Sequence, residues 1–256
     1  MSAIRDVYEL EGQVTVRHVI DDDLIKEGRS HVEWLLANHP EKRPEQLDHT
    51  LVRDDPFWVR LISDSRLLDI AEQFIGPNIA LFASHYIAKP PLDGQAVLWH
   101  QDGSFWPLEP MDVVTLWLAI DDSTPENGCM RVIPGSHRQN LQGLQRRTDV
   151  ENVLGSGLDP ALVDESQARD VALDPGDVSI HHPNVIHDSQ ANNSQRWRRG
   201  LTIRYIPTTT RIISEEPWPS AFLLRGDASP GVNEYQQRPR YVEGKHMAFR
   251  GAEAWV

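Results

Sequence analysis

The stretch Asp112-Val113-Val114-Thr115-Leu116-Trp117-Leu118-Ala119-Ile120-Asp121 carries the clearest strand pattern in the sequence. Alternate side chains of an extended strand point to opposite faces. One face of this strand is therefore wholly aliphatic, and its members are Val114, Leu116, Leu118 and Ile120. The other face is mixed and carries Val113, Thr115, Trp117 and Ala119. We expect the aliphatic face to meet the main core and the mixed face to line a cavity.

Shorter strand patterns lie on both sides of this stretch. They cover residues 79–89, 95–100, 129–133, 171–173, 178–182 and 200–206. Turn-forming sequences separate them, such as Pro125-Glu126-Asn127-Gly128 and Asp174-Pro175-Gly176-Asp177. Many short strands at this spacing favour a β-sandwich or a jelly roll.

The chain before residue 76 has a helical pattern instead. Residues 21–39 are predicted to form a helix that begins at an acidic triplet and ends at Pro40. Residues 55–74 are predicted to form a second helical region, in which Ser63 or Asp64 caps a new segment. We expect these helices to pack on one sheet.

Two segments lack sustained periodicity. Residues 138–170 are polar, and we interpret them either as a lid or binding loop or as a merely mobile loop. Residues 207–256 are predicted to be irregular, but their aromatic content indicates that they pack on the domain.

Length and charge restrict the class of protein. A chain of 256 residues is long enough for one domain, which we place at 1–256. The net charge of −13 argues against binding to nucleic acid or to an anionic membrane, so we expect a small-molecule partner and leave the oligomeric state open. The single cysteine, Cys129, excludes an internal disulfide and a cysteine-based zinc cluster. No apolar run approaches 18 residues and residues 1–20 lack a signal pattern, so we expect a cytoplasmic location.

The stretch Trp99-His100-Gln101-Asp102-Gly103 places an imidazole and a carboxylate two residues apart. On an extended strand both side chains share one face, so both can reach one metal ion. Such a pair is common by chance, and a strand end with two polar residues explains it equally well. A site therefore requires a third ligand from elsewhere in the chain.

The densest histidine cluster lies at residues 181–189. We interpret His181 and His182 as ordinary polar residues at a strand end. His187 follows a break at Pro183-Asn184 and is the better candidate for a ligand.

Eleven residues after His187, a strand begins whose polar face carries Arg198, Gly200, Thr202 and Arg204. This face can be buried only if it lines a solvated or ligand-filled cavity. A guanidinium is a favoured partner for a carboxylate because it offers paired N–H donors in a rigid fork. The pattern therefore predicts an acidic co-substrate.

The ordered combination of these motifs resembles the phytanoyl-CoA dioxygenase family, to which ectoine hydroxylase also belongs. The resemblance covers about residues 76–206. It rests on Trp99-His100-Gln101-Asp102, Val114-Thr115-Leu116-Trp117, Asn127-Gly128-Cys129, Pro134-Gly135-Ser136-His137, His187-Asp188-Ser189 and Arg198. It implies a mainly β fold with flanking helices, the cupin-like jelly roll called a double-stranded β-helix.

The same resemblance implies a set of site residues. His100, Asp102 and His187 would hold Fe(II) and leave positions for other ligands, including O2. Contacts to 2-oxoglutarate would come from Arg198, Ser189, Trp117, Gln101 and His85. We add Thr115 because it shares a strand face with Trp117. Phe105 and Trp106 are candidates for a substrate-pocket wall, and Arg204 is a candidate either for an anionic group of the substrate or for a structural ion pair.

The resemblance implies a non-haem Fe(II)- and 2-oxoglutarate-dependent dioxygenase. Such an enzyme would hydroxylate an unactivated C–H bond of a small polar metabolite and release succinate and CO2. The related iron halogenases lack the carboxylate ligand. Because Asp102 is present here, we expect a hydroxylase and not a halogenase. The alternative is a non-enzymatic or zinc-dependent jelly-roll protein that uses the same three ligands, and Arg198 argues against it. The acidic balance also argues against a coenzyme A thioester as the substrate.

Overall fold

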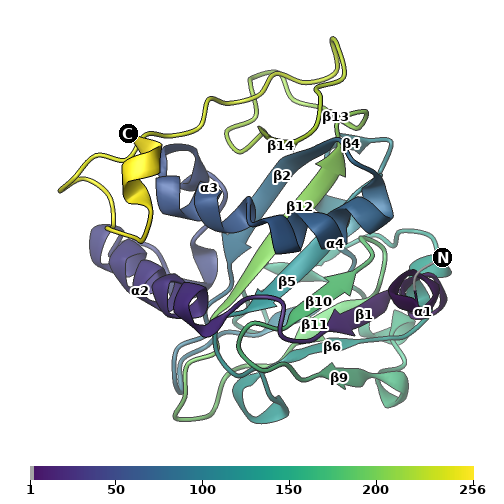
Figure 1. The fold of residues 1–256 in the computed structure, drawn as a ribbon. Helices are drawn as coiled ribbons and strands as arrows, with labels where there is room; N and C mark the ends of the chain where they lie inside the picture. The colour runs from purple at the N-terminus through teal and green to yellow at the C-terminus, as the bar shows by residue number, and fades with distance from the viewer. Residues whose placement is uncertain (1–2) are drawn as a thin grey trace.

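Two antiparallel sheets form the centre of the molecule in the computed structural model, which describes residues 3–256 (Figure 1). The larger sheet has the strand order β1-β10-β5-β12-β2-β14, and the smaller has β3-β11-β6-β9. The strands of the larger sheet are β1 (Gln13–Val16), β2 (Ile79–Tyr86), β5 (Val114–Ala119), β10 (Val178–His181), β12 (Gly200–Pro207) and β14 (Phe222–Arg225). Those of the smaller sheet are β3 (Val97–His100), β6 (Met130–Val132), β9 (Arg169–Val171) and β11 (His187–Ser189). The predicted jelly roll is confirmed.

Strand β5 lies inside the larger sheet between β10 and β12. In its register Leu116 is paired with Ile180 on one side and with Ile203 on the other. The four aliphatic residues of its predicted core face are all at most 1% exposed and belong to the main hydrophobic cluster. On its other face, Trp117 and Ala119 pack with Met130 and Val132 of the smaller sheet. The assignment of the aliphatic face is therefore confirmed, whereas of the mixed face only Trp117 lines the cavity described below.

A helical layer covers the outer face of the larger sheet (Figure 1). The helices are α1 (Ala3–Glu11), α2 (Asp22–Asn38), α3 (Pro56–Ile62) and α4 (Ser65–Ile75). Asp21 caps α2 by accepting from the N–H of Leu24, and Asp64 caps α4 by accepting from the N–H of Arg66. The predicted helical regions 21–39 and 55–74 are thus confirmed, with the break at the Asp64 cap.

The helices are held to the sheet by buried aromatic residues. Trp58 of α3 is fully buried, and its indole N–H donates to Ser84 Oγ of β2 at 2.9 Å. Burying a side chain of this size stabilises a fold by roughly 1.5–3 kcal/mol. The helical layer consequently belongs to the main core.

Several short elements were not predicted. They are α1, β1, β11 and β14, the pairs β4 (Leu108–Glu109) with β13 (Arg211–Ile212) and β7 (Gln145–Arg146) with β8 (Ser156–Gly157), and the 3-10 helices η1 (Pro44–Gln46), η2 (Val52–Asp54), η3 (Asp102–Phe105), η4 (Pro125–Asn127), η5 (Ser136–Arg138), η6 (Pro160–Leu162), η7 (Glu165–Gln167) and η8 (Ala252–Trp255). The tail after residue 207 is therefore less irregular than expected, because β14 extends the larger sheet. Its predicted packing is confirmed, since Phe249 and Ala252 belong to the main cluster.

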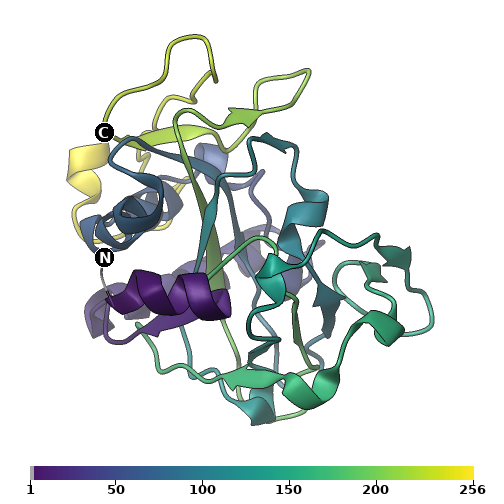
Figure 2. The same cartoon turned by 90° about the vertical axis from the view of Figure 1, so that its right-hand side faces the viewer.

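The layers place the interior of the jelly roll away from the helices. In the rotated view, the helices lie on one side of the larger sheet and residues 138–170 lie on the other (Figure 2).

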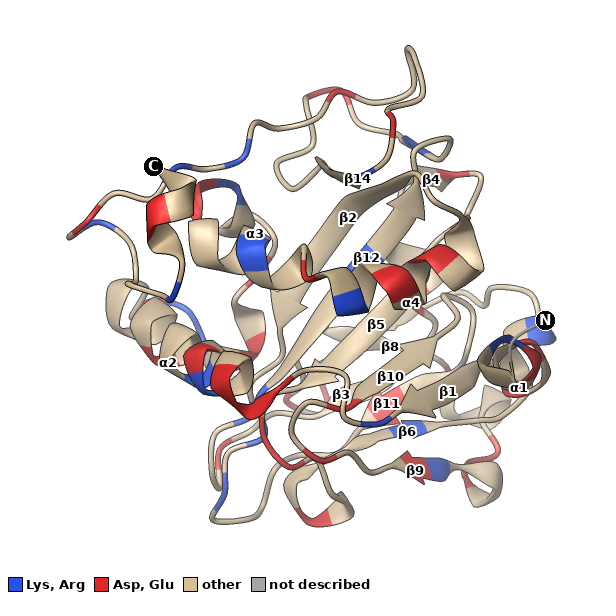
Figure 3. Ribbon diagram, viewed as in Figure 1, with Lys and Arg blue, Asp and Glu red and all other residues tan. Residues whose placement is uncertain are grey.

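Charged residues gather on helices and loops, where acidic and basic positions are mixed (Figure 3). No helix among residues 3–256 has the length and apolarity that crossing a membrane requires.

Candidate metal centre and adjoining cavities

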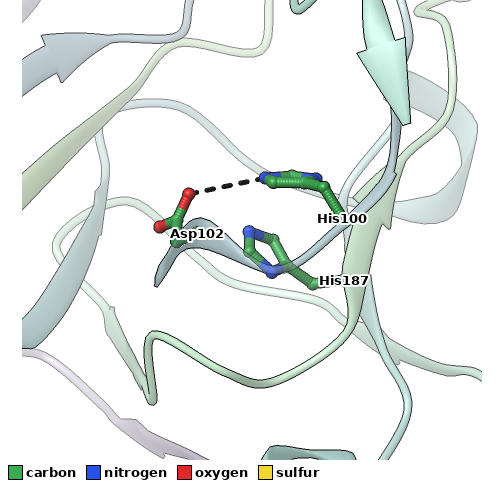
Figure 4. A group of neighbouring side chains, drawn as sticks. All are labelled: His100, Asp102 and His187. Atoms are coloured by element: carbon green, nitrogen blue, oxygen red, sulfur yellow. Dashed lines mark ion pairs between the residues drawn. The ribbon is translucent and has the colours of Figure 1, made fainter. Parts of the chain in front are cut away.

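Three side chains converge between the two sheets (Figure 4). His100 is the last residue of β3, Asp102 begins η3 and His187 begins β11. Register pairing places His187 directly opposite His100. One ligand atom from each residue lies within 4.8 Å of the others, and all three residues are buried. The structure thus brings together the three ligands predicted from the sequence.

The local conformation differs from the expected strand. Strand β3 ends at His100, and Asp102 lies in a 3-10 turn. Gln101 keeps an extended backbone, with φ −120° and ψ 121°, so the side chains before and after it still lie on the same side. As a result, His100 Nε2 and Asp102 Oδ1 are 3.5 Å apart.

The two imidazoles are oriented for metal binding. His100 Nδ1 lies 2.8 Å from the carbonyl oxygen of Leu98, and His187 Nδ1 lies 3.0 Å from that of Val185. A carbonyl oxygen only accepts, so each Nδ1 carries the hydrogen and each neutral ring keeps its lone pair on Nε2. Burial is the main cause that holds the pKa of His187 well below its usual value, and the nearby His100 lowers this pKa further. Both effects favour the neutral ring. The donor set therefore fits a divalent metal ion.

Asp102 is the ionised member of the set. Burial alone would raise the pKa of this carboxyl, but the nearby Arg204, His100 and His181 hold it well below its usual value. His181 Nε2 lies 3.6 Å from Asp102 Oδ2. His181 ends β10 and is outside the group of three candidate ligands, as expected, but it also lines the cavity beside the carboxylate, which was not predicted. His182 instead lies on the outer side, against Tyr8 and His137.

A cavity of about 90 Å³ opens beside these residues. Its walls include Trp117, Ser189, Arg198, Thr202 and Arg204. The polar face of β12 thus lines a cavity, as predicted. Because a buried polar face requires a partner, this cavity is suited to a charged ligand.

Arg198 lacks a carboxylate partner within the described part of the chain. It is 2% exposed, and its Nε has no hydrogen-bond partner among residues 3–256. Its Nη2 lies 3.4 Å from Ser189 Oγ, and its guanidinium lies 5.2 Å from the centre of the Trp117 ring. Burial lowers the pKa of Arg198 to about 10, so the side chain is still a cation at neutral pH. This arrangement predicts an anionic ligand beside Arg198.

Lys89 is a buried residue that sequence reasoning missed. The sequence placed it only at the end of the strand pattern 79–89, yet it is 0% exposed and its Nζ donates to Ser189 Oγ at 2.7 Å and to the carbonyl oxygens of Ser189 and Gln190. These partners lie a hundred residues further along the chain, so no local pattern signals the contact. Lys89 fixes Ser189 at the edge of the cavity.

Gly200 makes room for the indole of Trp117. A Cβ at this position would lie 2.0 Å from Trp117 Cζ2, far closer than real contacts allow. Thr115 is fully buried on the same face of β5, but it does not line the cavity. Its Oγ1 has no hydrogen-bond partner among the described residues.

Gln101 points away from the cavity. Its Nε2 donates to the carbonyl oxygen of Asn184 at 2.8 Å, and its Oε1 accepts from the N–H of Gln142 at 2.9 Å. The structure therefore does not bring Gln101 to the co-substrate pocket expected from the resemblance. Its contacts join the metal-binding turn to residues 138–170.

Residues 138–170 contribute to both cavities of the site. The N–H of Val153 donates to the carbonyl oxygen of Ala96 at 2.9 Å, which anchors the segment beside β3. Val153 and Leu154 line the small cavity and also a larger adjoining cleft. This position favours the binding-loop interpretation.

The larger cleft has a volume of about 530 Å³, within the range typical of small-molecule sites. It shares Ile87, Asp102, Val153, Leu154 and Arg204 with the small cavity, so the two adjoin at the metal centre. The predicted substrate residues Phe105, Trp106 and Arg204 all line this cleft. His85 also lines it, where its Nδ1 accepts from Arg204 Nη1 at 2.8 Å.

Comparison with known proteins gives relatives of one family. The chain is 28% identical over 220 residues to a Caenorhabditis elegans protein named phytanoyl-CoA dioxygenase domain-containing protein 1 homolog, covering 83% of this chain and 74% of that one. It is 27% identical over 253 residues to L-proline trans-4-hydroxylase of Streptomyces griseoviridis, covering 88% and 92%.

Solved structures share the fold. The non-heme monooxygenase ThoJ superposes with a TM-score of 0.77 at 23% identity, covering 91% of this chain and 87% of that one. EctD from S. alaskensis with 2-oxoglutarate and 5-hydroxyectoine superposes with a TM-score of 0.70 at 20% identity, covering 93% and 88%. The sequence profile of the family described as phytanoyl-CoA dioxygenase (PhyH) matches residues 8–200, which include all three candidate ligands and Arg198. The chain belongs to the phytanoyl-CoA dioxygenase family.

Proposed function

We propose that this protein hydroxylates an unactivated C–H bond of a small polar metabolite, with conversion of 2-oxoglutarate to succinate and CO2. As a family member it is a 2-oxoglutarate-dependent dioxygenase that uses iron. The observation that carries the proposal is the convergence of His100, Asp102 and His187 beside the unpaired, buried cation of Arg198. A cytoplasmic location and a single domain remain predictions.

In this proposal the two histidines and Asp102 hold Fe(II), which supplies oxygen activation when bound. Three protein ligands leave coordination positions for the co-substrate and O2. The carbonyl oxygens of Leu98 and Val185 keep the imidazoles in the tautomer that presents Nε2.

Arg198 and Ser189 bind the distal carboxylate of 2-oxoglutarate. The guanidinium supplies charge and paired N–H donors, and the Ser189 hydroxyl supplies a further hydrogen bond. Lys89 holds Ser189 in place, and the Trp117 ring stacks on the guanidinium. Val153 and Leu154 cover the adjoining space with apolar surface and so exclude water from the reacting groups.

The test begins with anaerobic protein, Fe(II) and 2-oxoglutarate. We expect a visible charge-transfer band, followed by succinate release when O2 and a substrate panel are added. Asp102→Ala and His187→Ala should abolish the band, whereas His39→Ala should keep it because His39 ends α2 away from the site. No band with wild-type protein would refute the proposal.

Arg198 is tested separately through the affinity for the co-substrate. Arg198→Ala should weaken 2-oxoglutarate binding by about a hundredfold or more, since it removes a buried charge-assisted partner. Arg169→Ala is a matched control, because that arginine is exposed on β9 and pairs with Glu11. Unchanged affinity in Arg198→Ala would remove Arg198 from the site.

The zinc-dependent or non-enzymatic alternative makes different predictions. A closed structural site has four protein ligands, whereas the described residues supply three and leave an adjacent cavity. Metal analysis of protein prepared with and without air distinguishes the two, because the alternative gives bound zinc and no response to 2-oxoglutarate.

A further inference from the structure

We propose that the substrate carries a single carboxylate, which Arg204 binds, on an apolar or aromatic body that fills the larger cleft. This inference rests on the proposed function and narrows it, because it places the polarity of the substrate in its carboxylate and gives the rest of the molecule an apolar surface. It is carried by the contacts of Arg204, by the charge of the two cavities and by the walls of the cleft.

Arg204 lies where the two cavities meet. It is 9% exposed and lines both of them. Its Nη1 donates to His85 Nδ1 at 2.8 Å and to Thr202 Oγ1 at 3.0 Å, and Trp106 stacks on its guanidinium at 5.1 Å. Three groups from different parts of the chain therefore fix its orientation.

The other edge of the same guanidinium is unsatisfied. Its buried Nε has no hydrogen-bond partner among residues 3–256, and its Nη2 approaches only Asp102 Oδ2, at 3.8 Å. Nε and Nη2 form the edge that binds a carboxylate through two parallel hydrogen bonds. This edge, which lies beside Asp102, therefore has the donor geometry that suits a planar anion.

The charge balance of the loaded site also requires an anion here. A divalent ion and Arg198 are together neutralised by Asp102 and a dianionic co-substrate. Asp188 is paired with Arg131, and at the cleft Glu45 pairs with Arg43 and Asp48 with Lys42. Glu41, which also lines the cleft, is 67% exposed and lies 3.6 Å from His39 Nδ1. The carboxylate nearest Arg204 is Asp102, at 3.8 Å, and this carboxylate is also a candidate metal ligand. A buried guanidinium that shares its carboxylate with a metal ion is costly unless a ligand supplies further negative charge, and a monoanion would supply it.

The body of the ligand follows from the cleft walls. Trp218 stacks on Phe82 with ring centres 5.2 Å apart, and its indole N–H already donates to the carbonyl oxygen of Phe82 at 2.8 Å. Phe105 and Leu154 line the same cleft and are 42% and 37% exposed, unlike the buried aliphatic core. Exposed apolar side chains in a concave site favour apolar ligand surface against this wall, whereas residues 41–49 give the cleft a second, polar wall.

The test measures binding and needs no turnover. Anaerobic protein is loaded with Fe(II) and saturating 2-oxoglutarate, which occupies Arg198, and is titrated with 3-phenylpropanoate and octanoate. The uncharged 3-phenylpropanamide and octanamide serve as matched probes. Tryptophan fluorescence and the shift of the visible band report binding. We expect at least one carboxylate to bind about tenfold or more tightly than its amide.

Variants assign the preference to a residue. Arg204→Gln should abolish the preference for carboxylate, whereas Arg204→Lys should retain part of it; each variant is first loaded with Fe(II) and saturating 2-oxoglutarate, and the visible band verifies the loading. Lys42→Gln, which removes a cation of the same cleft that is already paired with Asp48, should change little.

The inference is overturned if wild-type protein binds each acid no better than its amide, binds none of the four probes, or keeps its preference in Arg204→Gln. Failure of the proposed function is distinct, because the band with Fe(II) and 2-oxoglutarate would then be absent before any probe is added.

Discussion

Replacing Gly200 with alanine should damage the co-substrate pocket without touching a predicted ligand. The added Cβ would lie 2.0, 2.5 and 2.6 Å from three atoms of the Trp117 indole, whereas ordinary contacts begin at 3.4 Å. The closest ring atom must therefore move by about 1.4 Å, the difference between 3.4 and 2.0 Å. Gly200 lies on β12, paired with β5, so the backbone cannot yield easily and the ring moves instead.

The displaced indole has two consequences. Overpacking of this kind costs about 1–3 kcal/mol of folding stability. In addition, the ring stacks on Arg198 and lines the small cavity, so its movement misplaces the group that would bind 2-oxoglutarate. A misplacement of about 1 Å can reduce activity by about a hundredfold. We therefore expect 2-oxoglutarate affinity to fall by about ten- to a hundredfold while Fe(II) binding persists.

The assay is an anaerobic titration of the visible band with 2-oxoglutarate, together with thermal unfolding. Gly143→Ala is the control, because nothing lies within 4 Å of a Cβ at that position. The double variant Gly200→Ala/Trp117→Phe removes the outer indole atoms and should recover much of the lost affinity and stability. Wild-type affinity in Gly200→Ala, or no recovery in the double variant, would refute this reasoning.

Further predictions follow from other parts of the site and its surroundings. Adding Fe(II) should raise the melting temperature of wild-type protein by several degrees, because a ligand at about a hundred times its Kd stabilises the folded state by about 2.7 kcal/mol. EDTA should reverse this increase, and the melting temperature of His187→Ala should not respond to Fe(II). Gln101→Ala should speed hydrogen exchange in residues 138–147 and leave 2-oxoglutarate affinity within about twofold, because Gln101 contacts backbone and not the cavity. Burial, and after it the nearby histidines, lowers the pKa of His182 to about 4, so the unfolded chain binds more protons between about pH 4 and 6.5. Wild-type stability should therefore decrease as the pH is lowered from about 6.5 to about 4, and His182→Gln should make this decrease smaller, as measured by urea unfolding at each pH.

Alternation along single strands made much of the site predictable. In β5 it separated the core face from the face of Trp117, and in β12 it placed Arg198, Thr202 and Arg204 on a cavity-lining face. Such assignments depend only on the two-residue period of a strand, which is a local property of the sequence.

Contacts between distant segments were not predictable in the same way. The buried contacts of Lys89 were not predicted, because its partners at Ser189 and Gln190 lie about a hundred residues away in the sequence and are brought to it only by the fold. Strand β11 has three residues, too few to show alternation, although it carries His187. The position of His181 beside Asp102 was not predicted, because Asp102 comes from η3, a distant segment of the chain.

Gln101 shows where local geometry and family resemblance point in different directions. Alternation places His100 and Asp102 on one side of an extended Gln101, and the same rule sends the Gln101 side chain to the opposite side. The resemblance assigned all three to one pocket. The backbone of Gln101 is extended, and its amide is held by Asn184 and Gln142, away from the cavity. The rule that makes the metal pair converge therefore also removes the residue between them from the co-substrate site, and Gln101 acts on the chemistry only by fixing the turn that carries Asp102.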